Sequence, residues 1–463
     1  MKYIFLLISL FTFNFLQAQV TGVVKDAAGE PIPGANVFWM NTTNGVTTNE
    51  DGNFSIHKPA RSHMLVVSFI GFENDTIHVD KGNQQLDIVL REGVELSEVN
   101  VVTRKLGTMK LRTSVMNEDM ISSAELTRAA CCNLGESFVT NPSVDVSYSD
   151  AATGAKQIKL LGLSGTYVQM MTENIPNFRG AAAPYGLGYV PGPWMQSIQV
   201  SKGSSSVKNG YESITGQINV EFKKPQLPEA DWVSANLFAS STNRYEANAD
   251  ATVKLSKRWS TSLLAHYENE TKSHDSNDDG FVDIPRVEQY NVWNRWAYMG
   301  DHYVFQAGIK ALHETRNSGQ IAHGNTPSHD LYEIGIKTNR YEAFTKNAYI
   351  FDKEKNTNLA LILQGTLHNQ DANYGRKLYD VDQSNFYASL LFETELSKQH
   401  SLSAGLSFNY DGYDQNYRLT NQAEEGLTKK FVKESVPGAY VQYTFNLNDQ
   451  LMLMGGIRGD YSS

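Results

Sequence analysis

The run with the clearest chemistry is DSNDDGFVD, inside a long polar stretch. Five of its residues offer oxygen ligands in the order that begins an EF-hand calcium loop. They are the side chains of Asp275, Asn277, Asp279 and Asp283 and the carbonyl of Phe281. The run departs from that loop where Arg286 stands in place of the bidentate glutamate. Two interpretations stay open: a structural Ca²⁺ site that orders the loop, or an acidic surface loop. No other cofactor is expected.

The only cysteines are the neighbours Cys131 and Cys132. Their Cα atoms are about 3.8 Å apart, which is closer than ordinary disulfide geometry allows. Two adjacent thiolates can bind a soft metal such as Cu(I). The alternative is that both side chains are simply buried under a helix.

A Gly-, Ala- and Tyr-rich run, NFRGAAAPYGLGYVPGP, covers residues 177–193. Rigid aromatic side chains give large contact areas at a small entropy cost, so this run suits ligand contact. The candidates are Phe178, Arg179, Tyr185, Tyr189 and Trp194. Scattered Met and His residues tilt the expected ligand slightly towards a metal or a metal chelate.

Catalysis has little support. The chain contains no H-x-x-E zinc motif, no G-x-S-x-G elbow and no Gly-rich phosphate loop. Its formal net charge of −10 argues against a nucleic-acid surface. We therefore expect a protein that is not an enzyme and that has no nucleic-acid partner.

The N-terminus predicts export. Lys2 precedes the apolar run Tyr3 to Leu16, and Leu16-Gln17-Ala18 provides a small-residue cleavage site. This pattern is typical of a secretory signal peptide over residues 1–18. No later run of about 20 apolar residues predicts a transmembrane helix.

The next segments predict a small all-β domain and a linker. Residues 19–92 contain about seven short alternating runs separated by turns such as Asn49-Glu50-Asp51-Gly52, which predicts a β-sandwich. Residues 93–115 form a polar linker with one β-prone run, ELSEVNVVTR. Such an exposed strand can be recruited by a partner sheet through its unpaired N–H and C=O groups. One more strand of the sandwich is the alternative interpretation.

Residues 116–225 predict an α+β domain. Ser122 or Ser123 can cap a short helix through Ala124-Glu125-Leu126. Two strands, near Ile198–Val200 and Ile218–Glu221, enclose a run of Gly, Ser, Asn and Tyr before a Lys-Lys-Pro stop.

Residues 226–463 have a different sequence pattern. Alternating segments of about 10 residues recur, as in NLALILQGTLH, where leucines share one face and Gln364, Thr366 and His368 share the other. Aromatic ends such as Trp259 and Tyr349 suit an interfacial girdle. Short connectors alternate with long ones, among them 369–383 and 411–435. About eleven strands fit, against roughly 22 in plugged transporters, so we expect the N-terminal half of a transmembrane β-barrel.

These motifs together resemble the TonB-dependent outer-membrane receptors. The resemblance rests on the strand, Lys-Gly turn, Tyr and Gly-x-Ile-Asn strand of residues 198–221 and on the Glu-Val-x-Val run of the linker. Residues 19–92 resemble the carboxypeptidase-regulatory-like domain that precedes such receptors in Bacteroidetes-type bacteria. The fold that this implies is mostly β: a small sandwich, an α+β plug and an incomplete antiparallel barrel.

The resemblance also implies a location, partners and an activity. It places the chain in the bacterial outer membrane, with periplasmic N-terminal domains and a lipid-facing barrel. It identifies a TonB box as the site that the TonB protein of the inner-membrane energising complex would pair with. The box residues are Glu95, Leu96, Ser97, Glu98, Val99, Asn100, Val101, Val102 and Thr103. The expected activity is active import of a scarce solute; a receptor that senses its ligand without importing it is the alternative.

Overall fold

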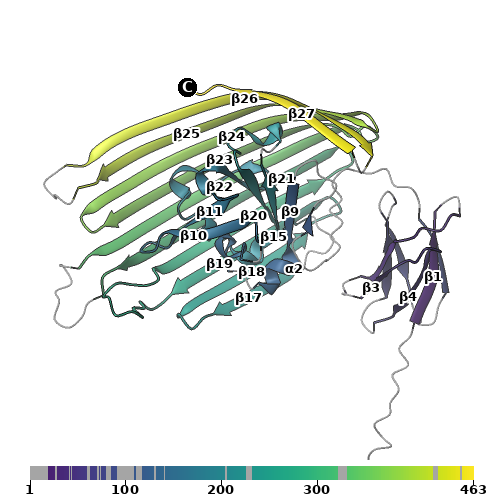
Figure 1. Cartoon of the computed structure of the whole chain (residues 1–463), viewed down its shortest axis with the longest axis horizontal. Helices are drawn as coiled ribbons and strands as arrows, with labels where there is room; N and C mark the ends of the chain where they lie inside the picture. The colour runs from purple at the N-terminus through teal and green to yellow at the C-terminus, as the bar shows by residue number, and fades with distance from the viewer. Residues whose placement is uncertain are drawn as a thin grey trace, which may run out of the picture. The chain divides into compact units, whose positions relative to one another are not determined.

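The computed structural model describes residues 19–26, 29–40, 42, 44–59, 63–69, 72, 74–79, 85–90, 109–110, 117–129, 132–139, 141–203, 206–225, 232–321, 331–420, 426–448 and 451–463. The predicted signal peptide (1–18), the box strand (95–103) and Cys131 lie outside these residues. The chain forms two compact units, Met1–Val101 and Val102–Ser463 (Figure 1). No helix in the described ranges is long and apolar enough to cross a membrane.

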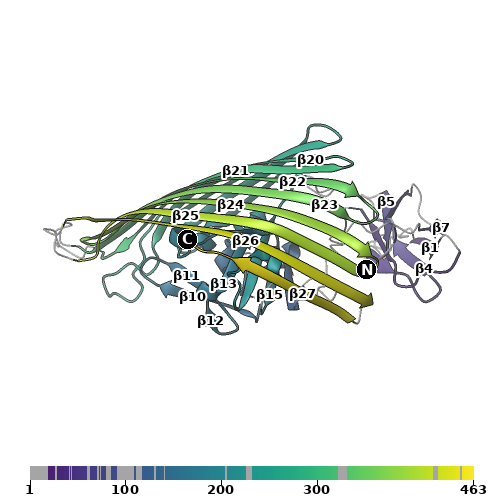
Figure 2. The same cartoon turned by 90° about the horizontal axis from the view of Figure 1, so that it is seen from above.

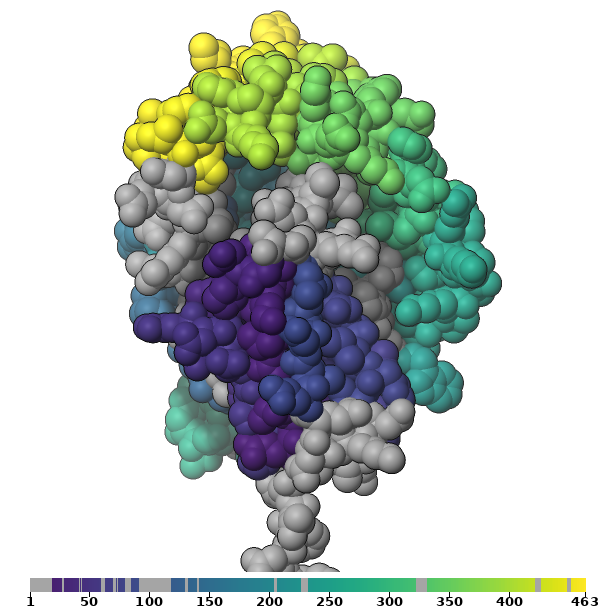
Figure 3. Space-filling model, turned by 90° about the vertical axis from the view of Figure 1, so that its right-hand side faces the viewer, coloured from purple at the N-terminus to yellow at the C-terminus, as the bar shows by residue number. Residues whose placement is uncertain are grey.

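The first unit contains the predicted β-sandwich. One sheet has the strand order β4-β1-β7 and the other the order β3-β2-β5-β6. The strands are β1 (Gln19–Lys25), β2 (Asn36–Trp39), β3 (Gly45–Thr47), β4 (Asn53–His57), β5 (Met64–Ser68), β6 (Asp75–His78) and β7 (Gln85–Val89). Exposed and buried residues alternate along β1, so that one face of it enters the core. One face of this domain is seen in purple and blue in Figure 3.

The sandwich core is apolar, and its buried Thr48 hydroxyl is fully hydrogen-bonded. Val37, Trp39 and Leu65 are fully buried in it. The buried Thr48 hydroxyl accepts a hydrogen bond from the Ala35 N–H (2.8 Å) and donates one to the Ile32 carbonyl (2.7 Å). Two hydrogen bonds offset the cost of burying that hydroxyl.

The second unit begins with residues 109–222, which we call the plug. Its six-stranded sheet has the order β14-β13-β16-β15-β9-β8, and its smaller sheet the order β10-β11-β12. The strands are β8 (Met109–Lys110), β9 (Asn117–Ser122), β10 (Val144–Asp150), β11 (Ala155–Leu160), β12 (Leu163–Ser164), β13 (Val168–Thr172), β14 (Ile175–Pro176), β15 (Met195–Lys202) and β16 (Gly216–Phe222).

Strand β16 lies in the middle of the plug sheet. It is antiparallel to β15, where Ile198 faces Val220, and parallel to β13, where Met170 faces Ile218. All seven residues of β16 are buried. The two strands predicted near residues 198 and 218 are therefore confirmed, and they pair directly.

One α-helix and six short 3₁₀ helices complete the described part of the plug. Helix α2 (Ser123–Arg128) begins where the sequence predicted, and its cap is Ser122, whose Oγ accepts a hydrogen bond from the Glu125 N–H. The 3₁₀ helices are η1 (Leu134–Glu136), η2 (Gly165–Tyr167), η3 (Gly180–Ala182), η4 (Gly186–Tyr189), η5 (Gly192–Trp194) and η6 (Val207–Asn209).

Residues 233–460 form one antiparallel sheet of eleven strands, which we call the wall. Each strand pairs with its neighbours in sequence, from β17 to β27. The strands are β17 (Val233–Ala239), β18 (Arg244–Lys254), β19 (Trp259–Glu270), β20 (Arg286–Met299), β21 (Tyr303–Gly319), β22 (Glu333–Asp352), β23 (Thr357–Tyr374), β24 (Lys377–Ser397), β25 (His400–Arg418), β26 (Thr428–Asn448) and β27 (Leu451–Asp460). The wall curves over the plug (Figure 2).

The two faces of the wall differ as the alternating pattern predicted. On β23, Leu367 is 55% exposed on the outer face, whereas His368 beside it is fully buried. The plug covers the inner face, which carries Gln364, Thr366 and other polar residues. The outer face keeps its apolar side chains exposed.

Two of the predicted long connectors are wrong. Residues 369–383 contain only the turn Gly375-Arg376, because β23 and β24 stay paired up to Tyr374 and Lys377. In the same way, β25 extends to Arg418 and β26 starts at Thr428. Four wall strands have 19–21 residues, about twice the roughly 10 that cross a bilayer. Paired strands can continue beyond the apolar band with polar residues. Because these segments are polar, the sequence pattern predicted loops there.

Candidate functional site

The interface between the plug and the inner face of the wall is the candidate site. One hydrophobic cluster contains residues of both parts, such as Trp194 and Phe222 of the plug and Trp293 and Leu312 of the wall. Plug and wall therefore share a core. Polar contacts cross this shared core at several places, and four of them are described below as crossing points.

The first crossing point is the turn between β13 and β14. Glu173 and Asn174 form this turn with positive φ angles. The buried Glu173 carboxylate lies 2.6 Å from Arg295 Nη2 and 3.6 Å from Lys346 Nζ. Burial alone would raise the pKa of Glu173, but these cations lower it to about 2. The turn is therefore an anion held by two cations of the wall.

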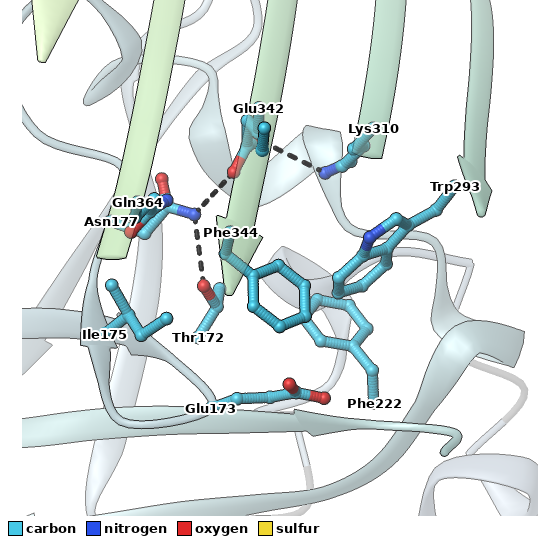
Figure 4. A pocket seen from close by; sticks show the side chains of 11 residues that line it. Thr172, Glu173, Ile175, Asn177, Phe222, Trp293, Lys310, Glu342, Phe344 and Gln364 are labelled. Carbon is cyan, nitrogen blue, oxygen red and sulfur yellow. Dashed lines mark hydrogen bonds and ion pairs between the residues drawn. The ribbon is translucent and has the colours of Figure 1, made fainter. Parts of the chain in front are cut away.

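Asn177 forms the second crossing point, next to the first (Figure 4). Its Oδ1 accepts a hydrogen bond from Arg340 Nη2 (2.6 Å), and its Nδ2 donates one to Glu342 Oε2 (2.9 Å). Glu342 is also 3.6 Å from Lys310 Nζ. The oxygen and the nitrogen of this amide both bind β22, which fixes its orientation against that strand.

Aromatic rings surround a small cavity between these two points. The cavity, about 20 Å³, is bordered by Phe222, Trp293 and Phe344 among others (Figure 4). The Arg295 guanidinium lies 4.5 Å from the centroid of the Trp293 ring. Cation–π contact adds to the ion pair in holding this buried cation. The cavity has room for about one water molecule, not for a transported solute.

Arg179 forms the third crossing point. Its Nη2 lies 3.0 Å from Asp411 Oδ2 of the wall and 2.9 Å from Glu212 Oε1 of the plug. Next to it, the Ala181 N–H donates a hydrogen bond to Gln383 Oε1 (3.0 Å). Gly180 has φ +62°, and a Cβ there would lie 2.7 Å from Gln383 Nε2. Only glycine fits this close approach.

The fourth crossing point lies where the long connectors of the wall emerge. Glu136 of η1 is 3.0 Å from Arg244 Nη1 of β18. At the tip of the β10–β11 hairpin, the Thr153 carbonyl accepts a hydrogen bond from Arg316 Nη1 (3.0 Å). The wall thus binds backbone groups of the plug as well as plug side chains.

The five residues predicted to contact a ligand all lie at this interface, but four of them face its interior. Phe178, Tyr185, Tyr189 and Trp194 are between 0% and 6% exposed. Arg179 is partly exposed and already paired with two carboxylates. In this conformation these side chains hold the plug in the wall, and their contact with a ligand stays a prediction.

The predicted metal ligands do not come together in the described residues. Asp275 accepts hydrogen bonds from the N–H groups of Asp279 and Gly280, and Asp283 accepts one from Ser276. No group of three or more His, Cys, Asp or Glu residues is placed to hold a metal within the described part of the chain. The calcium site stays a prediction, with Asn277 and the Phe281 carbonyl among its ligands.

Cys132, two residues before η1, is buried, and burial raises the pKa of its thiol. A thiol with a raised pKa is a poor nucleophile and a poor metal ligand at neutral pH. Cys131 lies outside the described residues, so the soft-metal interpretation of the pair stays a prediction.

The sequence reasoning missed the residues that carry most of the interface. The sequence pattern did not identify Glu173, Asn177 and Glu212 of the plug as contact residues. It also did not identify Arg295 or the Arg340–Glu342 pair of the wall. A signal was present: charged residues recur at every second position on the inner face of the wall strands. That pattern indicates a polar lumen, but it does not predict which plug residue pairs with each charged residue of the wall.

Comparison with known proteins agrees with this architecture. Residues 20–102 match the model of the CarboxypepD_reg-like domain, and residues 110–217 match that of the TonB-dependent Receptor Plug Domain. The TonB-dependent receptor SusC of Bacteroides thetaiotaomicron is 28% identical over 245 residues, which are 50% of this chain and 24% of SusC. The TonB-dependent receptor P39 of Formosa agariphila is 39% identical over 100 residues, or 21% of this chain and 10% of that protein.

Solved structures share the fold at low sequence identity. The copper transporter OprC has a TM-score of 0.61 and 13% identity, covering 74% of this chain and 54% of that one. The alcaligin receptor FauA of Bordetella pertussis also has a TM-score of 0.61, with 14% identity over 80% of this chain and 63% of that one. This chain thus spans about a quarter or less of those curated relatives and a little over half of those solved chains.

Proposed function

Since the chain belongs to the TonB-dependent outer-membrane receptors of Bacteroidetes type, we propose that it imports a scarce solute by TonB-dependent active transport. The observation that carries this proposal is the plug itself. A folded domain lies in the curve of the wall and shares its core and its buried charges. A solute that follows the inner face of the wall can pass only when the plug moves.

The contacts between the plug and the wall determine how much work is needed to displace the plug. Breaking a buried ion pair by removing one partner costs about 3–5 kcal/mol. Glu173 forms a pair of this kind with Arg295 of the wall, and the partly exposed Arg179 forms a second ion pair with Asp411. Thermal motion rarely breaks several such contacts together, so displacement of the plug calls for an external source of work.

The proposed source of work is TonB. The run 95–103 would pair with a strand of TonB by β-augmentation, and tension on the linker would then reach the plug through β8 and β9. The outer membrane holds no ATP, so energy from the inner-membrane complex is physically required for uphill uptake. The solute itself stays open. Two of the scattered methionines that tilted the expected ligand towards a metal chelate, Met171 and Met195, are buried and give that choice no support.

Deletion of residues 95–103 tests the proposal. We expect the deletion to abolish uptake of the solute while the protein still reaches the outer membrane and binds the solute on intact cells. A panel of metal chelates, cobalamin, haem and oligosaccharides, each supplied as the limiting nutrient, identifies that solute. Normal uptake by the deletion variant would overturn the proposal. A transcriptional response without accumulation would instead favour a sensing receptor.

A further inference from the structure

An open groove of about 320 Å³ lies on the plug, away from the four crossing points except at one end. One side is formed by the residues after η1, including Phe138, Val139 and Asn141. The other side is formed by five successive residues of β10, Val144 to Tyr148. Its volume is at the lower end of the range for small-ligand pockets.

The groove runs along the edge of a strand. Successive side chains of a strand point to opposite faces, so a groove bordered by five residues in a row follows the strand edge. In the described structure β10 is the end strand of the sheet β10-β11-β12 and pairs only with β11 (Figure 1). The N–H and C=O groups on its other side face the groove. Five strand residues span about 13 Å, the length of an extended tetra- or pentapeptide.

Two buried polar groups in the groove have no hydrogen-bond partner among the described residues. Asn141 is 3% exposed, and its Oδ1 accepts a hydrogen bond from the Ser143 N–H (2.8 Å). Its Nδ2 has no such partner, and neither does Ser147 Oγ. Both atoms are therefore able to form a hydrogen bond to a guest in the groove.

The charges along the groove are unequal. At one end, Lys156 lies 3.7 Å from Glu136 and 5.6 Å from the centroid of the Tyr148 ring. Towards the other end, Asp145 is exposed; Lys159 of β11 stands opposite it in the strand register, and no ion pair to Asp145 is found in the described part of the chain. A guest with a cationic side chain opposite Asp145 would complement that carboxylate. Val139, which is 85% exposed, offers an apolar contact between the two ends.

We propose that β10 and this groove bind the solute through an extended peptide backbone, so that the solute is a short linear peptide. This inference rests on the proposed import function and names its substrate class. The peptide adds a strand to the edge of β10, where backbone hydrogen bonds give affinity. Asn141 and Ser147 bind its polar groups, and Asp145 selects a lysine or an arginine.

Paired synthetic peptides test the geometry. The probe is a fluorescent pentapeptide of alternating Val and Thr with a central Lys, titrated onto the protein purified from outer membranes in detergent. Two twins carry N-methyl groups on one or the other alternating set of amides. Only one set faces a given neighbouring strand. We expect one twin to bind at least about tenfold more weakly, because each lost hydrogen bond weakens binding several-fold, and the other within about twofold.

Two matched variants place the site. Val139→Arg should obstruct the groove and weaken binding about tenfold, whereas Ile214→Arg, at another exposed position of the plug, should leave it unchanged. Equal weakening by both twins, or full binding by Val139→Arg, would overturn the inference. So would slow hydrogen exchange of the β10 amides without peptide, which would mean that the chain's own residues occupy the edge. The import proposal fails separately, on uptake by the 95–103 deletion.

Discussion

The sandwich and the plug–wall interface both bury a continuous apolar core, but they differ in what else they bury. The sandwich core holds Trp39 and Leu65 with few polar groups, and the Thr48 hydroxyl is satisfied within it. The plug–wall interface instead buries charged side chains such as Glu173, Arg295 and Asp411. The sandwich is thus built to stay folded by itself, whereas the plug is held by discrete contacts to another part of the chain.

That difference is one of mechanism as well as of composition. Apolar burial is non-directional and is lost gradually with the area exposed. A buried charge pair is directional, and losing one partner leaves a charge that the interior cannot stabilise. An interface of the second kind holds one position firmly and is lost in discrete steps.

The largest expected effect comes from breaking the Glu173–Arg295 pair. Arg295→Met should destabilise the seated plug by about 3–5 kcal/mol, because it leaves the Glu173 carboxylate without its nearest cation. Protease cleavage within residues 109–222, measured on intact outer membranes, reports the loosening. Arg258→Met removes an exposed pair with Asp301 and should cost no more than about 1 kcal/mol. Equal protection of the two variants would contradict the role given to the buried pair.

Acid should loosen the same contact without a mutation. A carboxylate whose pKa is lowered on folding stabilises the folded state above its ordinary pKa, and this stabilisation is lost as the pH falls through the lowered value. The pKa of Glu173 is lowered to about 2, so its contribution is present at pH 7 and declines from about pH 4.5 towards pH 2. The protection factor of the β13–β14 turn, which is its hydrogen-exchange rate relative to the unprotected rate at the same pH, should fall over that range.

Glu173→Gln provides the control for the acid experiment. The protection factor of the turn should be lower at neutral pH in this variant and should depend less on pH, because the titrating group is gone. If the variant keeps the full acid dependence, another group is responsible.

In the sandwich, by contrast, the expected damage is local. Leu65→Ala should cost about 2–5 kcal/mol through lost burial and the cavity left behind. We expect earlier thermal unfolding of residues 19–90 and unchanged protease protection of the plug. Loss of plug protection in this variant would show that the two units depend on each other for stability.

The smallest effect is expected at Gly180. Gly180→Ala forces a side chain into φ +62° and against Gln383, at a cost of about 1–2 kcal/mol. The plug should exchange hydrogen faster near Arg179 but remain seated. Gly203→Ala shares the positive φ and has open space around its Cβ, so it separates backbone strain from steric contact with the wall.

The sequence predicted the outline of the molecule well and its contacts poorly. Alternation along NLALILQGTLH assigned the faces of β23 correctly, because a strand repeats every two residues whatever its partner. Ser122 also predicted the start of helix α2 correctly, because a capping side chain binds backbone groups within one turn of itself. Glu173, Arg295 and Asp411 could not be paired from the sequence, because each pair joins residues more than 100 positions apart.

The aromatic candidates in and next to the run 177–193 also show that sequence alone does not predict contacts. Composition alone marked Tyr189 and Trp194 as suited to binding, and the structure buries both completely. A ring that suits a ligand also suits a protein interface, since both need a large rigid surface. Only the fold distinguishes the two uses.

The position of β16 has a consequence for how the chain is assembled. This strand is the last of its sheet to be synthesised, yet it lies between β13 and β15. Until residue 222 is present, the sheet exists only as two separate pieces, β14–β13 and β15–β9–β8. The six-stranded sheet of the plug therefore cannot be completed early during synthesis, because its last strand joins the two halves.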